Sequence, residues 1–161
     1  MKKIKVSLCD LANDFNGIDN KSIPIGPGYV GAYCKKIHED SINLKVFRTF
    51  KTFWEDSLND APDIVGFGSY DWNHNLTLVT IEKLKILNKK VLIALGGANA
   101  EINMADNEIF LTKYPNIDYL IYGDGEKPFA NIVKEYIKLN LCKDWRSKLN
   151  LVNLIFRTLV L

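Results

Sequence analysis

The chain has 161 residues, 47% of them hydrophobic, and a formal net charge of +2 at pH 7. This size and composition fit one domain with a substantial hydrophobic core. The lysines are scattered along the chain, so neither nucleic acid nor a membrane surface is an expected partner. The longest apolar run, residues 149–161, is interrupted by Asn150, Asn153 and Arg157 and is too short to span a bilayer.

Cysteine usage and the first residues indicate a cytoplasmic protein. The three cysteines (Cys9, Cys34 and Cys142) are far apart and form no CxxC pair. They favour buried small side chains in a reducing compartment over a disulfide framework or a zinc site. Met1 is followed at once by a strand-like segment without a cleavage site, so the sequence predicts no signal peptide.

Strands and helices are predicted to alternate along the chain. Short apolar segments predict strands at residues 4–9, 44–48, 64–68, 91–95 and 119–122. Helices are predicted after residues 26–28, around 52–59, from about residue 76, near 105–113 and through 129–137. The apolar face of the third of these helices is predicted to consist of Leu76, Val79, Thr80, Leu84 and Leu87.

This alternation predicts a right-handed, doubly wound α/β domain. Its Rossmann-like parallel sheet of five strands would lie between two helical layers in a three-layer sandwich, with the flavodoxin-type order 2-1-3-4-5. The segment 44–48 alternates apolar and polar residues like an edge strand, whereas 64–68 reads as a strand buried on both faces. Residues 1–140 are expected to form this domain. Residues 141–161 would be a tail or the start of a following domain, and residues 143–161 are expected to be dispensable for the fold.

The informative loops all follow predicted strands. They begin at Asp10 and at residues 69–73, 96–97 and 123–126. In an open parallel sheet, ligands bind outside the carboxyl ends of the strands, where these loops collect. The glycines in the last two loops would let the backbone approach a ligand closely, although each of these loops could also be a plain tight turn.

The side chains near residues 69–73 leave several possibilities open. Tyr70 and Trp72 could cover a flat ligand or simply cap the edge of the sheet. His74 is expected to be a surface residue rather than a ligand, and His38 a solvated residue near the end of the first helix. The sequence indicates no Ser-His-Asp or Cys-His pairing.

Several nucleotide-binding classes are excluded by missing motifs. There is no GxxxxGK[ST], and Gly66 and Gly68 lie inside a strand without a third glycine. The segment DLANDFNG after the first strand is not a phosphate-binding turn. Response regulators share the topology, but Asp10 is a single acid at a place where they have a pair.

Taken together, the loops resemble the cobalamin-binding domain that precedes the barrel in many radical SAM enzymes. The similar segments follow one another in order over about residues 1–140. They are PIGPGY at 24–29, PDIVGF at 62–67 with Ser69 and Trp72-Asn73, LGG at 95–97, DY at 118–119 and GDGEKPF at 123–129. The resemblance implies a corrinoid over the carboxyl edge of the sheet, with its nucleotide tail running into the domain.

The resemblance also implies which residues bind the cofactor. These are Ser69, Tyr70, Trp72, Asn73, Gly96, Gly97, Gly123, Asp124, Gly125 and Glu126. Ser69 and the glycine pair 96–97 match positions that line the nucleotide tail of the cofactor. The loop 123–126 matches a loop that approaches the corrin ring. On this basis Gly97→Leu is expected to block cobalamin binding while leaving the fold nearly intact.

Two departures from the family pattern limit the expected chemistry. Methyl-carrier cobalamin proteins have DxHxxG after the first strand, whereas residues 10–15 read DLANDF and lack the histidine that binds cobalt. The chain also has no CxxxCxxC motif and no barrel to hold an iron–sulfur cluster. By itself it is therefore not expected to perform the radical step.

The sequence thus predicts a cobalamin-binding domain with no catalytic residues and no metal-ligating side chain of its own. Cobalamin would be bound with its base displaced from cobalt and no histidine in its place. A radical SAM barrel, in the same chain or another, would be a partner. Two alternatives stay open: an interaction or signalling module on the same fold, and a fragment that keeps the fold and binds nothing.

Overall fold

The computed structural model describes residues 3–12, 23–100 and 104–140. Within these residues a five-stranded parallel sheet has the order β2-β1-β3-β4-β5, which confirms the predicted doubly wound fold. The strands are β1 (Ile4–Ala12), β2 (Ile42–Thr49), β3 (Ile64–Gly68), β4 (Leu92–Gly96) and β5 (Tyr119–Leu120). The predicted tail at 141–161 lies outside the described residues.

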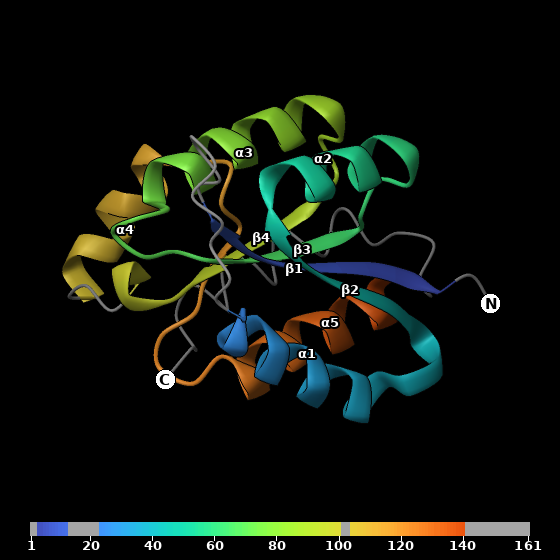
Figure 1. Ribbon diagram of the computed structural model, residues 1–161. Coiled ribbons are helices and arrows are strands. Elements are labelled where there is room, and N and C mark those ends of the chain that lie inside the picture. Colours follow the sequence, from blue (N-terminus) through green and yellow to red (C-terminus); the bar gives the residue numbers. More distant parts are fainter. Residues whose placement is uncertain (1–2, 13–22, 101–103, 141–161) are drawn as a thin grey trace.

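Helices cover both faces of the sheet (Figure 1). One face carries α1 (Ile25–His38) and α5 (Glu126–Asn140). The other carries α2 (Phe50–Asn59), α3 (His74–Leu87) and α4 (Met104–Lys113). Short 3₁₀ turns lie before β2, at η2 (Glu39–Ser41), and after β4, at η3 (Ala98–Ala100). No helix in the part of the chain that the structure describes is long and apolar enough to cross a membrane.

The strand at the edge of the sheet is β2, as its alternating pattern predicts, and it pairs with β1. The first strand continues past residue 9 to Ala12, which pairs with Thr49 after an irregularity in the register. By contrast β5 is shorter than predicted and ends at Leu120. The carboxyl ends of β1 and β2 are therefore joined further along than the sequence indicates.

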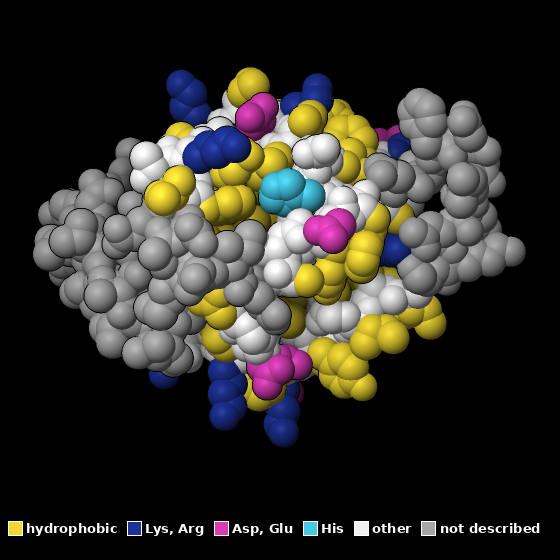
Figure 2. Space-filling view, turned by 90° about the vertical axis from the view of Figure 1, so that its left-hand side faces the viewer, with side chains coloured by type: hydrophobic (Ala, Val, Ile, Leu, Met, Phe, Trp, Pro, Cys, Tyr) yellow, Lys and Arg dark blue, Asp and Glu magenta, His cyan; other side chains and the backbone are white. Residues whose placement is uncertain are grey.

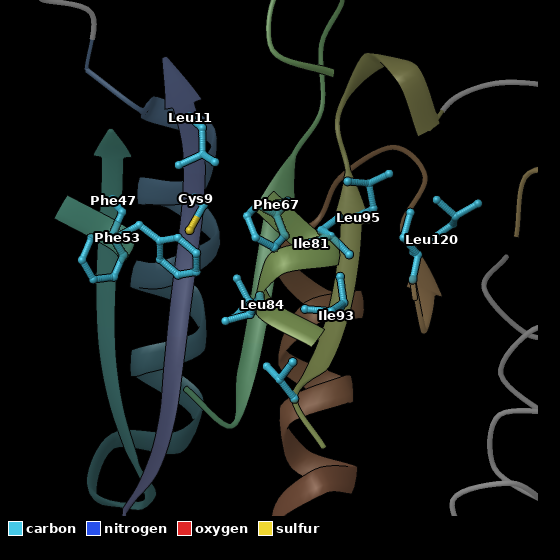
Figure 3. Close-up of a cluster of buried hydrophobic side chains, with 13 residues drawn as sticks. Cys9, Leu11, Phe47, Phe53, Phe67, Ile81, Leu84, Ile93, Leu95 and Leu120 are labelled. Atoms are coloured by element: carbon cyan, nitrogen blue, oxygen red, sulfur yellow. The ribbon is translucent and has the colours of Figure 1, made fainter. Parts of the chain in front are cut away.

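Side chains alternate between the two faces, so each face has its own core. Figure 3 shows the core under α2 and α3, where Phe53 lies between the rings of Phe47 and Phe67. Both contacts are edge-to-face, with ring centroids 5.4 and 5.8 Å apart. The core on the opposite face includes Val6, Leu8, Ile64 and Leu92, together with Phe129, Val133 and Tyr136 of α5.

The predicted apolar face of α3 is wrong in part, because Val79 and Leu87 are exposed. The buried side chains of this helix are Thr77, Thr80, Ile81 and Leu84. Thr80 can be buried because its hydroxyl donates to the Leu76 carbonyl oxygen at 2.7 Å. The sequence pattern included Thr80 but missed Thr77 and Ile81, which are buried as well.

Aspartate carboxylates accept backbone N–H groups near the amino ends of the strands. Asp63 accepts the backbone N–H of Lys5 at 2.8 Å. Asp118 accepts the backbone N–H of Ile93 at 2.8 Å and forms an ion pair with Lys85 at 2.8 Å. These contacts lie at the edge opposite to the one at which the predicted loops meet.

The cysteines that the structure describes are buried, as predicted. Cys9 and Cys34 are both fully shielded and have free thiols. Burial raises the pKa of both thiols, that of Cys34 to about 12. Cys142 lies outside the described residues.

Candidate functional site

A pocket of about 230 Å³ lies at the carboxyl ends of the central strands, between the sheet and helices α1 and α5. This edge is on the left in Figure 1, and Figure 2 looks directly onto it. Pockets that enclose whole drug-sized ligands measure about 300–1,000 Å³. The present pocket is smaller, so it has room for only part of a larger molecule.

The strands supply a floor of small residues. On β3 and β4, the residues that face α1 and α5 near the carboxyl edge are Gly66, Gly68, Ala94 and Gly96. Their neighbours in sequence face the other way and are large: Val65, Phe67, Ile93 and Leu95 all belong to the core under α2 and α3. The pocket therefore exists because two adjacent strands lack side-chain bulk on one face only.

Added side chains would fill this space to different degrees. A β-carbon on Gly96 would lie 3.6 Å from the Ile121 carbonyl oxygen, an ordinary contact. A β-carbon on Gly66 would lie 2.7 Å from side-chain atoms of Leu8 and Phe129. The space above Gly66 is thus already occupied, whereas a β-carbon on Gly96 would fit at ordinary contact distance.

The walls come from α1 and from the segment after β5. The amino end of α1 contributes Gly26, Pro27, Tyr29 and Val30. The segment after β5 contributes Ile121, Gly123, Asp124, Gly125, Glu126 and Phe129. The described lining residues include two carboxylates but no lysine or arginine. Most Lys and Arg side chains visible in Figure 2 project from the upper and lower margins of this view.

One wall is an aromatic pair. Tyr70 lines the pocket, and its ring stacks on Trp72 with centroids 4.7 Å apart and planes 5° from parallel. The Tyr70 hydroxyl oxygen lies 3.6 Å from the β-carbon position of Gly26 on α1. Burial, together with the nearby Asp10 carboxylate, raises the pKa of Tyr70, so the phenol stays protonated at neutral pH.

The structure brings most of the predicted site residues together. The pocket is lined by Tyr70, Gly96, Gly97, Gly123, Asp124, Gly125 and Glu126. Three others, Ser69, Trp72 and Asn73, are not among its lining residues. Ser69 is fully buried, and its hydroxyl lies 2.8 Å from His74 Nδ1. Trp72 stacks on the Tyr70 ring, and Asn73 is buried. Cobalamin binding by all ten residues stays a prediction.

The expectation that Gly97→Leu leaves the fold nearly intact is wrong. Gly97 has a φ of +96°, and a β-carbon there would lie 2.6 Å from the Ser69 carbonyl oxygen. A side chain at this position would strain the backbone and collide with the neighbouring loop. The substitution would therefore damage the fold, so it does not isolate an effect on binding.

Both histidines have partners that the sequence did not reveal. His74 packs near Phe110 as well as contacting Ser69. His38 is half-buried, and its Nε2 lies 2.8 Å from the Ala130 carbonyl oxygen on α5. Neither residue lines the pocket. Within the described ranges, no three His, Cys, Asp or Glu side chains are grouped closely enough to hold a metal ion.

Apart from Gly96, the residues of the floor and of the α1 wall were not in the predicted site, although Gly26, Pro27 and Tyr29 lie within the similar segment 24–29. The signal for the floor was present in the sequence, because 66, 68, 94 and 96 are alternate positions in two neighbouring strands and are all Gly or Ala. Val30 and Phe129 were not among the residues predicted to bind the cofactor, yet both line the pocket. Nothing in the sequence pattern indicates which wall a helical side chain contributes to.

A doubly wound sheet with a pocket at its carboxyl edge defines a ligand-binding α/β domain. Residues 17–133 match the model of the family described as the B12 binding domain. This match covers more than half of the chain, and the chain belongs to that family.

A relative with a named activity is 2-(S-pantetheinyl)-carbapenam-3-carboxylate methyltransferase from Streptantibioticus cattleyicolor. The two sequences are 26% identical over 74 residues, which is 46% of this chain and 10% of the relative. The match thus spans about a tenth of the methyltransferase's length.

Proposed function

We propose that this chain binds cobalamin, with the nucleotide tail of the cofactor in the pocket between the sheet and helices α1 and α5. The observation that carries the proposal is the one-sided loss of side-chain bulk at Gly66, Gly68, Ala94 and Gly96. Membership of the B12 binding domain family supports it. Because the pocket holds only about 230 Å³, the corrin macrocycle would remain outside it.

The chemistry of the lining fits a flat and weakly charged group. Aliphatic and aromatic side chains such as Leu8, Val30 and Phe129 offer apolar contact, and Tyr70 offers a ring and a hydroxyl donor. Asp124 and Glu126 would repel a multiply charged phosphate group placed near them. This lining therefore favours a heteroaromatic base over the phosphate end of a flavin or dinucleotide.

The positions of the histidines support binding with the base displaced and no histidine ligand to cobalt. The whole sequence contains two histidines. His38 is tied to α5, and His74 faces Ser69 on the far side of the loop. Bound cobalamin would supply cobalt-centred chemistry, while this chain's residues would bind the tail and shield it from water.

The domain would act within a larger enzyme system. The similarity to the carbapenam methyltransferase and the resemblance of the loops to cobalamin-dependent radical SAM enzymes support a radical SAM barrel as the partner. In that arrangement residues 1–140 would carry the cofactor, and residues 141–161 would lead toward a following domain. The chemical step would then belong to the partner.

The test is to mix the purified chain with hydroxocobalamin, remove free cofactor by desalting, and record the visible spectrum. We expect retained cobalamin with a spectrum of the base-off type. His74→Ala should leave that spectrum unchanged, because His74 is not expected to bind cobalt. A nitrogen-ligated spectrum that disappears in His74→Ala would overturn the predicted mode of binding.

Absence of retained cobalamin would favour one of the two alternatives, the interaction module or the fragment without a ligand. Gly96→Val is the matched variant for the pocket, because its β-carbon would make an ordinary 3.6 Å contact with the Ile121 carbonyl oxygen, whereas a β-carbon on Gly97 would collide with the Ser69 backbone. If Gly96→Val binds cobalamin as tightly as the unaltered chain, the pocket is not the site of the tail.

A further inference from the structure

A continuous series of polar contacts runs from the edge strand β2 to the aromatic wall of the pocket. Arg48 donates through Nη1 to the Asp10 carboxylate and to the Asp10 carbonyl oxygen, both at 2.8 Å. The other carboxylate oxygen of Asp10 accepts from the Asn73 amide at 3.2 Å. Asn73 in turn accepts the backbone N–H of Tyr70 at 2.8 Å.

These contacts are partly shielded from water. The Arg48 and Asp10 side chains are 18% and 14% exposed, and Asn73 is 1% exposed. Asn73 also donates to the Gly68 carbonyl oxygen at 3.2 Å, so its amide is engaged on both its donor and its acceptor side. Charge-assisted hydrogen bonds are stronger than neutral ones, and partial exclusion of water strengthens them further.

We propose that Asp10, Arg48 and Asn73 form a positioning network that holds Tyr70 and Trp72 as a preformed wall of the pocket. Arg48 fixes the Asp10 carboxylate, Asp10 fixes the Asn73 amide, and Asn73 fixes the backbone of Tyr70. The Tyr70 ring then lies against the pocket with Trp72 stacked on its far side. The three residues do not line the pocket, so they act on a ligand only through Tyr70.

The network matters for binding because an aromatic wall that is already ordered loses little freedom when a ligand arrives. Immobilising side chains on binding is unfavourable, and rigidifying the site beforehand reduces that cost. We expect Asp10→Ala, which removes the carboxylate that Arg48 and Asn73 both contact, to weaken hydroxocobalamin binding about tenfold. That fold-change corresponds to about 1.4 kcal/mol.

The competing explanation is that these contacts only stabilise the fold. Asp118 provides a matched control, because its carboxylate also accepts two hydrogen bonds and pairs with a cation at 2.8 Å. Its side chain is 21% exposed, close to the 14% of Asp10. Asp118 lies at the amino edge of the sheet, away from the pocket, so Asp118→Ala should reduce stability without changing affinity.

The wall itself can be observed without any ligand. Trp54→Phe and Trp145→Phe leave Trp72 as the sole tryptophan of the chain. In this background we expect Asp10→Ala, but not Asp118→Ala, to increase quenching of Trp72 fluorescence by acrylamide. Asp10→Asn keeps an oxygen facing Asn73, so it should have the same effect to a smaller degree, and it serves if Asp10→Ala does not fold.

The binding measurement rests on the proposed function, whereas the fluorescence measurement does not. A positioning role also predicts that Asp10→Ala has no further effect on affinity once Tyr70→Ala has removed the wall. Equal effects of the Asp10 and Asp118 variants on affinity, or additive effects of Asp10→Ala and Tyr70→Ala, would overturn the proposal. If the unaltered chain binds no hydroxocobalamin, the proposed function fails, and unchanged Trp72 quenching in the Asp10 variants would then overturn the network as well.

Discussion

The two faces of the sheet differ most at the carboxyl ends of β3 and β4. Toward α2 and α3, these strands present Val65, Phe67, Ile93 and Leu95 to a closed core of aromatic and aliphatic side chains. Toward α1 and α5, the alternate positions are Gly or Ala and leave a pocket. Near their carboxyl ends the two strands therefore stabilise the core with one set of residues and leave room for a ligand with the alternate set, because neighbouring residues in a strand point to opposite faces.

The largest effect is expected on the filled face. Phe67→Ala removes a ring that is 2% exposed and packs edge-to-face on Phe53. Truncation of a buried phenylalanine typically costs about 3–5 kcal/mol, so most of the domain's stability should be lost in urea unfolding. A loss below about 1 kcal/mol would mean that this face is less tightly packed than the comparison requires.

Gly97→Leu should come next, at the junction between the two faces. The positive φ and the collision with the Ser69 carbonyl oxygen should destabilise the fold by about 1–3 kcal/mol, as strained backbone positions do. Thermal unfolding measures this loss. Gly28→Ala is the control, because a β-carbon on Gly28 meets nothing within 4 Å and should slightly stabilise α1.

Gly96→Val should separate binding from stability on the hollow face. Its β-carbon makes an ordinary 3.6 Å contact with the Ile121 carbonyl oxygen, so we expect the free energy of unfolding to change by less than about 1 kcal/mol. Overpacking a ligand's space costs about 1–3 kcal/mol, which is a loss of cobalamin affinity of roughly five- to 150-fold.

Hydroxocobalamin titration and urea unfolding on one preparation would show whether Gly96→Val behaves in this way. A variant that loses stability but keeps its affinity would place Gly96 in the core rather than in a site.

The smallest effect concerns the carboxylate beside the hollow face. Burial raises the pKa of Asp10 above its ordinary value of 3.8, and the opposing effect of Arg48 does not cancel this shift. The folded state then binds a proton more readily than the unfolded state, so this group's contribution to stability falls as pH rises from 3.8 through the folded pKa.

Asp10→Asn removes this titration and keeps the shape of the side chain. Urea unfolding of both proteins from about pH 4, close to the ordinary Asp pKa, to about pH 7 should show the free energy of unfolding of the unaltered chain falling relative to that of the variant as pH rises. The opposite trend would mean that Arg48 outweighs burial and that the folded pKa of Asp10 is lowered.

The fold could be predicted because its determinants are local. Apolar segments such as 64–68 and 91–95, each bounded by Gly, Pro or polar residues, indicate buried parallel strands, and connection rules leave few topologies. The location of the site could be predicted by the same reasoning, since the loops after β3, β4 and β5 must meet at one edge of the sheet. Tyr70, Gly96 and Glu126 do line the pocket at that edge.

The remainder of the site depends on contacts between residues far apart in the sequence. Ser69 was expected to line the nucleotide tail of the cofactor, but its hydroxyl faces His74. Asp10 and Arg48 are separated by 38 residues, and only the lengthened pairing of β1 with β2 brings their side chains together. Pattern and spacing indicate where a loop lies, but they do not determine which way each of its side chains points.

The turns after β3 and β4 share backbone hydrogen bonds. The Ser69 N–H donates to the Gly96 carbonyl oxygen at 2.7 Å, and the Asn99 N–H donates to the Ser69 carbonyl oxygen at 3.2 Å. Hydrogen exchange from either amide requires the shared bonds to break, so the two turns should open as one cooperative unit rather than as independent loops. Local opening that admits a ligand would then occur at the opposite wall of the pocket, formed by the amino end of α1 and the segment 121–126.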